Sequence, residues 1–97
     1  MILEGVMLNV KPGAEEDYEQ AFEKASHIIA SMEGYRGHEL YRCLERKETY
    51  LLLIKWDTLE DHLIHFRQSE EYYEWKRLLH HFYDPFPTVE HFAKVNV

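Results

Sequence analysis

Hydrophobic and polar residues alternate along positions 2–11 of the chain. Val6 and Leu8 fall on one side of an extended backbone, and Leu3 and Met7 fall on the other. A period of two residues is typical of a β-strand with at least one buried face. Residues 49–56 are almost continuously apolar, which predicts a strand covered on both faces. Residues 35–46 alternate more loosely, and the charged turn after them predicts an antiparallel hairpin with the strand at 49–56.

Two stretches show helical spacing instead. From residue 14 to residue 32, apolar side chains recur every three or four positions, and Gly34 follows as a stop signal. A second helical pattern covers residues 57–81. Within it, Ser69 is followed by two glutamates, which is typical of a helix N-cap with acids in the first turn. The sequence therefore predicts two helical pieces with a break near Gln68.

The order of these elements predicts the fold. Prolines at 85 and 87 exclude a helix, and residues 89–97 alternate as a closing strand. The result is an α+β, ferredoxin-like βαββαβ fold: a four-stranded antiparallel sheet with both helices on one face. The uncovered face carries either the apolar set 50, 52, 54 and 56 or the pair Leu51 and Leu53. Neither set is suited to water, so we expect a homodimer that closes a dimeric α+β barrel.

Composition limits the classes of function. With 97 residues the chain is expected to form one domain over residues 1–97. A formal net charge of -7 repels phosphate backbones, so no nucleic-acid partner is expected. The longest apolar run is too short to span a membrane, and the N-terminus lacks a signal-peptide pattern, which predicts no membrane partner. The single cysteine, Cys43, fits a reducing compartment, and we expect a cytoplasmic location.

The stretch Leu51–His65, LLLIKWDTLEDHLIH, together with SEEYYEWK and PTVEHF downstream, resembles the antibiotic biosynthesis monooxygenase domain family. Its local signature is Trp56 at a strand end and His65 nine residues later. The resemblance extends over essentially the whole chain. It implies a homodimeric barrel whose subunits each hold a pocket between sheet and helices. It also implies a cofactor-independent monooxygenase that oxidises an aromatic phenol, quinol or polyketide-like small molecule with O2, using neither metal nor flavin.

Two departures from the family separate this chain from characterised branches. The heme-degrading branch uses an Asn, Trp and His set, and the aligned positions here are Val6, His65 and Trp75. The polyketide-oxidising branch carries an Asn four residues before the strand-end Trp and a Tyr six residues after it, where this chain has Leu52 and His62. Neither catalytic set carries over intact. Heme binding or degradation is therefore a less favoured alternative.

Histidine is the most unusual feature of the composition, with seven residues: His27, His38, His62, His65, His80, His81 and His91. Cofactor-free oxygenation needs a base near neutral pKa to deprotonate a phenol, and imidazole is suited to that step. We take His65 as the candidate base and His62 as a second polar contact, three residues apart on one helix face. A zinc or iron site built from these two and a third histidine is an alternative that the spacing does not require.

Aromatic residues supply candidate walls for a flat pocket, although packing in an ordinary core is the more common role for each of them. Arg67 is a candidate partner for an anionic phenolate. A non-catalytic module that binds a small molecule or regulates another protein is the alternative from a different class of function. The predicted substrate-binding residues are Trp56, Tyr72, Trp75, Arg67, Phe82 and Tyr41.

Overall fold

The computed structural model describes residues 1–97 and confirms the predicted α+β architecture. Four strands and two main helices follow one another in the expected order, with a π-helical segment (η1) and a short 3-10 turn (η2) in addition. The elements are β1 (Ile2–Asn9), α1 (Glu15–Ala30), β2 (Tyr35–Arg42), β3 (Thr49–Trp56), η1 (Asp61–Phe66), α2 (Glu70–Leu79), η2 (His80–Phe82) and β4 (Val89–Phe92).

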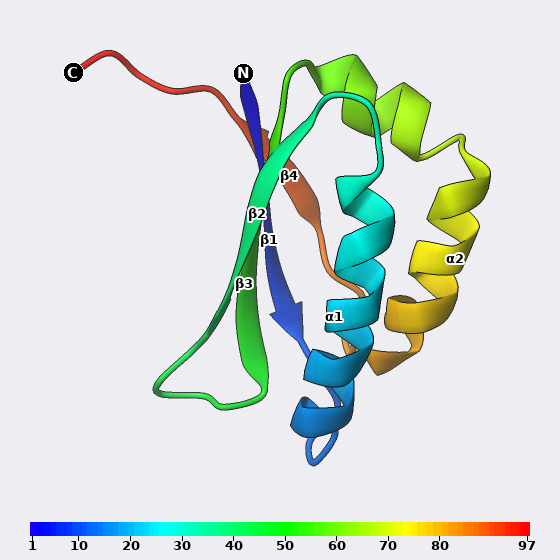
Figure 1. The fold of residues 1–97 in the computed structure, drawn as a ribbon. Coiled ribbons are helices and arrows are strands. Elements are labelled where there is room, and N and C mark those ends of the chain that lie inside the picture. Colours follow the sequence, from blue (N-terminus) through cyan, green and yellow to red (C-terminus); the bar gives the residue numbers. More distant parts are fainter.

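The strands form one antiparallel sheet in the order β2-β3-β1-β4. Both helices lie on the same side of it, as predicted (Figure 1). Glu4 of β1 lies opposite Ile54 of β3, and Val6 lies opposite Leu52, so even-numbered residues of both strands point toward the helices. The helix-facing set includes Tyr50, Leu52, Ile54 and Trp56, all buried. This register leaves Leu51 and Leu53 on the uncovered face and resolves the alternative left open by the sequence.

The core between sheet and helices is built from the apolar stripes of the helices. Helix α1 contributes buried residues spaced three and four apart, and α2 contributes two more, which is the pattern expected of helices with one buried face. Ser69 caps α2 as predicted, because its side chain accepts a hydrogen bond of 3.2 Å from the Tyr72 backbone N–H. The helical residues buried in this core are Tyr18, Phe22, Ala25, Ile29, Phe66, Trp75 and Leu79.

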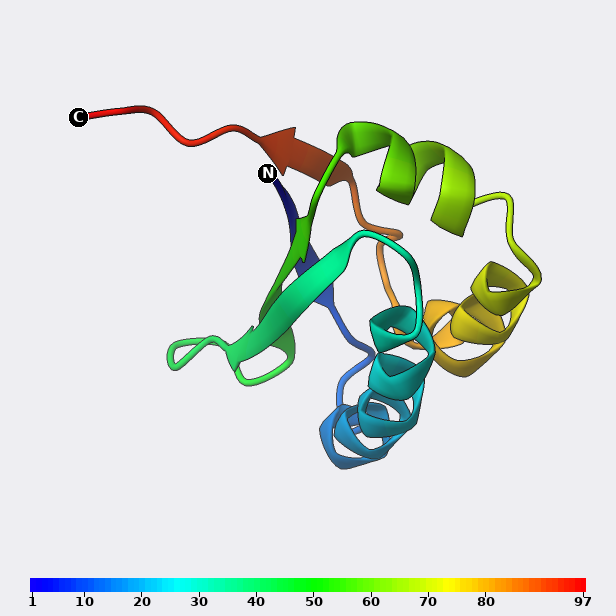
Figure 2. The same ribbon diagram turned by 45° about the horizontal axis from the view of Figure 1, so that its top comes forward.

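The closing strand is shorter than predicted. It ends at Phe92, and residues 93–97 are exposed and lie outside the sheet. Figure 2 shows this C-terminal segment leaving the sheet beyond β4. The reason is the register: Phe92 already lies opposite Leu3, so only Ile2 of β1 remains to pair with a longer strand.

The segment after β3 also differs from the expected α-helix. Its residues form a π-helical turn, in which the Arg67 N–H donates to the His62 carbonyl at 3.2 Å, five residues earlier. Because a π-helical turn contains more residues than an α-helical turn, two side chains three positions apart no longer lie on the same face. His62 consequently points inward and is 3% exposed, while His65 points outward with 55% of its side chain exposed. The prediction that both histidines share one helix face was wrong.

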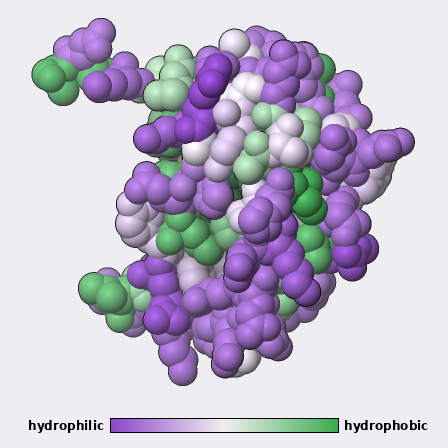
Figure 3. Space-filling view, in the orientation of Figure 1, coloured by the Kyte–Doolittle hydropathy of each residue, from purple (hydrophilic) through white to green (hydrophobic).

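The uncovered face of the sheet is apolar and hollowed. Two shallow hollows of about 280 and 300 Å³ lie on it, and Leu3 and Phe92 line both. Phe92 and Met7 are each 50% exposed there. In the edge-on view of Figure 3 the surface is mostly hydrophilic, with hydrophobic residues in its middle and on two projecting segments, the β2–β3 turn and the C-terminal end. None of the helices combines the length and the apolar character needed to cross a bilayer.

Candidate functional site

A buried polar array joins four elements beneath the helices. Glu4 of β1 accepts a hydrogen bond from Trp56 Nε1 of β3 at 2.9 Å. His62 of η1 places its Nε2 3.4 Å from the same Glu4 oxygen, and its Nδ1 shares a 2.7 Å hydrogen bond with His91 Nε2 of β4. Glu4, Trp56 and His62 are each at most 5% exposed, whereas His91 is half-buried. The array therefore runs from the interior toward the sheet edge.

Backbone register explains why these residues meet. Glu4 and His91 are direct partners across the β1–β4 ladder, so their side chains lie on the same face of the sheet. The inward turn of η1 then lays the His62 ring against Trp56, with ring centroids 5.5 Å apart and planes 17° from parallel. Because β4 is the edge strand, His91 is the member of the array that lies nearest to solvent.

Burial gives the array unusual proton affinities. Loss of water around Glu4 raises its pKa from 4.5 to about 7, and the Trp56 hydrogen bond and the Arg67 charge offset only part of that rise. Burial lowers the pKa of His62 to about 3, with further lowering by Arg67 and His91. His62 is therefore neutral near pH 7, while Glu4 changes its charge there.

Two further groups, Arg67 and Tyr83, interact electrostatically with this array. Arg67, which the sequence singled out as a phenolate partner, is an exposed cation whose charge lowers the pKa of Glu4, His62 and His91. Tyr83 has its pKa raised to about 12 by burial, and the charge of Glu4 adds to that rise. The electrostatic surroundings of the array thus include a cation at the surface and a partly buried phenol.

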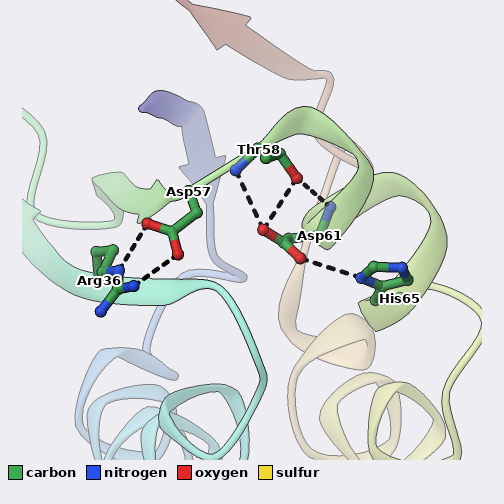
Figure 4. Close-up of polar contacts among 5 residues, drawn as sticks. All are labelled: Arg36, Asp57, Thr58, Asp61 and His65. Carbon is green, nitrogen blue, oxygen red and sulfur yellow. Dashed lines mark hydrogen bonds and ion pairs between the residues drawn. The ribbon is translucent and has the colours of Figure 1, made fainter.

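His65 belongs to a separate polar cluster on the outer side of η1 (Figure 4). Its Nδ1 lies 3.0 Å from an Asp61 carboxylate oxygen. The other Asp61 oxygen accepts hydrogen bonds from the backbone N–H and the hydroxyl of Thr58, and the Thr58 bonds are the largest cause of the lowered Asp61 pKa. Next to it, Arg36 and Asp57 form a bidentate ion pair at 2.6 and 2.7 Å. The outward imidazole is thus held by a buried carboxylate.

The remaining predicted site residues occupy different places. Trp56 and Trp75 are buried in the core, where both contact the Phe66 ring, and Tyr72 packs against the same ring. Phe82 packs on Tyr18 at the opposite end of the core, and Tyr41 is exposed on the uncovered face, where it bonds Glu39. The structure brings Trp56, Tyr72 and Trp75 together but keeps Phe82 and Tyr41 apart from them. The hollows that the structure contains lie elsewhere, on the uncovered sheet face and near the start of α1.

Sequence reasoning missed Glu4 and gave His91 no specific role. One signal was available: Glu4 interrupts the apolar even-numbered positions of the first strand, since Val6 and Leu8 share its face. A lone acid on a buried stripe indicates a paired or functional carboxyl. No group of three or more His, Cys, Asp or Glu side chains is arranged to hold a metal ion.

The pKa of Glu4 predicts a pH dependence of folding. Its folded pKa of about 7 exceeds the unfolded value of 4.5, so its contribution to stability is full below pH 4.5 and is lost as pH rises through 7. His62 acts in the opposite sense: its contribution is full above 6.5 and is lost as pH falls toward 3. Urea unfolding should show Glu4→Gln gaining about 3 kcal/mol relative to wild type between pH 4.5 and pH 8. A constant difference across that range would contradict a raised Glu4 pKa.

Comparison with known proteins identifies the family of this chain. The family model described as antibiotic biosynthesis monooxygenase matches residues 1–78. The chain therefore belongs to the antibiotic biosynthesis monooxygenase family, as the Trp56 and His65 signature indicated.

Individual relatives agree with this assignment. The chain is 55% identical over 95 residues to YczJ of Bacillus subtilis (strain 168), a protein of uncharacterized activity, covering 98% of this chain and 100% of that protein. It is 33% identical to a Bordetella bronchiseptica protein assigned to the antibiotic biosynthesis monooxygenases, with a TM-score of 0.93 and coverage of 98% and 97%. SnoaB, a cofactor-independent oxygenase from Streptomyces nogalater, shares the fold at 17% identity, with a TM-score of 0.79 and coverage of 99% and 94%.

Proposed function

We propose that this protein is a cofactor-independent monooxygenase that oxidises an aromatic phenol, quinol or related polyketide-like small molecule with O2. The observation that carries the proposal is the buried Glu4–His62 pair, which can accept a proton near neutral pH. Once a phenol is deprotonated, the electron-rich ring can pass an electron to O2 without a metal or flavin. When an activated ring CH2 becomes a carbonyl, one oxygen atom enters the product, and the other leaves as water with the two hydrogens.

The proposed base is the buried array of Glu4 and His62 rather than His65 alone, because the Glu4 carboxyl in this array has a pKa of about 7 and lies 3.4 Å from His62 Nε2. His65 stays a second candidate, since Asp61 orients its ring and leaves Nε2 directed away from that carboxylate. Trp56, Tyr72 and Trp75 are the proposed aromatic surroundings of the substrate, and Arg67 is the proposed partner of the phenolate. We place the reaction in the cytoplasm, consistent with a lone cysteine.

An oxygen-uptake assay tests this reaction. Wild type should consume O2 with a panel of anthrones and hydroquinones and should incorporate one atom of 18O2 into an anthrone product. His62→Gln should lower the rate about a hundredfold, which is the usual size of a general-base contribution. His65→Ala should lower it less. His27→Gln, on an exposed site of α1, is the matched control.

The opposite results would count against the proposal. Turnover that proceeds equally under nitrogen excludes an oxygenase. A wild-type rate in His65→Ala removes His65 from the mechanism, and a wild-type rate in His62→Gln removes the buried array.

We further propose that a second copy of the chain covers the open sheet face. That face is apolar, and its exposure to water is unfavourable. Its apolar residues are Leu3, Met7, Leu51, Leu53 and Phe92. Sedimentation should give twice the monomer mass of 11.8 kDa. Leu53→Glu should convert the dimer to monomer, whereas Tyr73→Glu, at an exposed aromatic on α2, should leave it intact. A wild-type monomer at micromolar concentration would contradict this arrangement.

Binding without turnover is the second candidate function. It is favoured by the two apolar hollows on the open face, whose charged lining groups are only Lys55, Lys94 and Glu90. Under this alternative, calorimetry detects binding of a phenolic compound while the compound and dissolved O2 both persist.

A further inference from the structure

His91 is the only member of the buried array that reaches the surface. It shares a hydrogen bond with His62 on one side, and its Nδ1 has no partner within the chain. His62 uses both of its ring nitrogens inside the protein, toward His91 and toward Glu4, and its side chain is 4% exposed. A substrate or a water molecule therefore meets His91 before it meets His62 or Glu4.

We propose that Glu4, His62 and His91 form a proton-transfer chain in which His91 takes the proton of the substrate and Glu4 stores it. This inference rests on the proposed oxygenase function for its substrate, a phenol or quinol. The proton-transfer chain itself is a property of the folded protein and does not require turnover. It assigns a role to His91, at the edge of the sheet, that neither the family signature nor the spacing of the histidines indicates.

The transfer balances through three proton shifts. The hydroxyl proton of the phenol passes to Nδ1 of His91, and the Nε2 proton of His91 passes to Nδ1 of His62. The Nε2 proton of His62 then passes to the Glu4 carboxylate. Each imidazole gains one proton and loses one, so both stay neutral and exchange tautomers. The products are a phenolate and a neutral Glu4 carboxyl, and no electron moves in this step.

The surrounding charges suit each member to its part. His62 is surrounded by Trp56 and Phe66, and a cation there would lack water, so this ring can pass a proton on but cannot keep it. Glu4 keeps the proton because burial favours its neutral form, while Trp56 Nε1–H steadies the carboxylate between turnovers. Arg67 is an exposed cation whose charge acts on the pKa of His91, so it can offset the charge of a phenolate that forms beside that ring.

The first test does not depend on turnover. In protein labelled with 15N-histidine, NMR measures how fast the His62 Nε2 proton exchanges with water. His91→Phe should slow this exchange about tenfold or more, because the proton loses its relay to the surface. His91→Gln, which keeps a polar side chain that does not tautomerise, should slow it as well. His27→Gln should leave it at the wild-type rate, and circular dichroism verifies that each variant is folded.

The second test uses the oxidation itself. His91→Gly should lose about a hundredfold in rate with an active phenol, and added imidazole should restore part of it by occupying the vacated space. Exchange at the wild-type rate in both folded His91 variants overturns the proton-transfer chain, whether or not oxidation falls. Slowed exchange with no oxidation of any compound in the panel supports the chain and overturns the oxygenase proposal. Slowed exchange with imidazole rescue supports both.

Discussion

Replacing Trp56 with alanine is expected to lower the free energy of unfolding by about 4 kcal/mol, the usual cost of truncating a buried tryptophan. The indole is fully buried and touches Tyr35, His62 and Phe66. Because small domains are stable by only about 5–15 kcal/mol, this loss is about a quarter or more of the total stability. Chemical denaturation followed by circular dichroism measures the change.

Trp56→Phe separates packing from the hydrogen bond to Glu4. It retains an aromatic ring but removes the Nε1–H donor, which lowers the pKa of Glu4 in the wild type. The variant should therefore have a Glu4 pKa above 7. Its free energy of unfolding should fall further below that of wild type as pH rises from 5 to 8, because the ionised carboxylate has lost a hydrogen-bond partner. A deficit that is the same at both pH values would show that the indole acts only as a packing group.

Gly34→Ala is expected to lower the free energy of unfolding by about 3 kcal/mol, the combined effect of a left-handed backbone and lost hydrogen bonds. Gly34 follows α1 with φ of +86°, and a Cβ placed there would lie 2.2 Å from Cγ of Asp61. Asp61 would have to give up its bonds to Thr58 and His65 to make room.

Gly13 provides a matched control for this effect. It has the same φ of +86°, but nothing lies within 4 Å of a Cβ at that position. Gly13→Ala should therefore cost only about 1 kcal/mol, which is the backbone contribution alone. In an Asp61→Gly background the excess cost of Gly34→Ala should shrink in a double-mutant cycle. Equal losses of stability in Gly34→Ala and Gly13→Ala would show that Asp61 does not clash with a Cβ at position 34.

The strand pattern and the helix signals were enough to predict the fold. The residues Thr49–Trp56 form β3 as the apolar run indicated, and Ser69 begins α2 as its cap chemistry indicated. Local periodicity determines such elements because a strand or helix buries one face whatever its partners are. The end of β4 could not be predicted in this way, since it depends on how much of β1 is left to pair.

The site was harder to predict because it depends on contacts between distant segments. His62 and His91 are 29 positions apart and Glu4 is far from both, so no local pattern joins them. The two predicted histidines were placed on one face because an α-helix was assumed, and the π-helical turn separated them. Only an acid on a buried stripe, Glu4, gave a sequence-level sign of the array.

The π-helical turn has a consequence for how the family can diversify. Its hydrogen-bonded ring encloses one residue more than an α-helical ring, so it corresponds to a one-residue insertion in an ordinary helix. Deleting residue 63 or 64 would shift the register of the outer imidazole relative to the inner one. Loss of a single codon within this turn therefore changes how the two imidazoles are oriented to each other without altering the sequence of any strand or of either main helix.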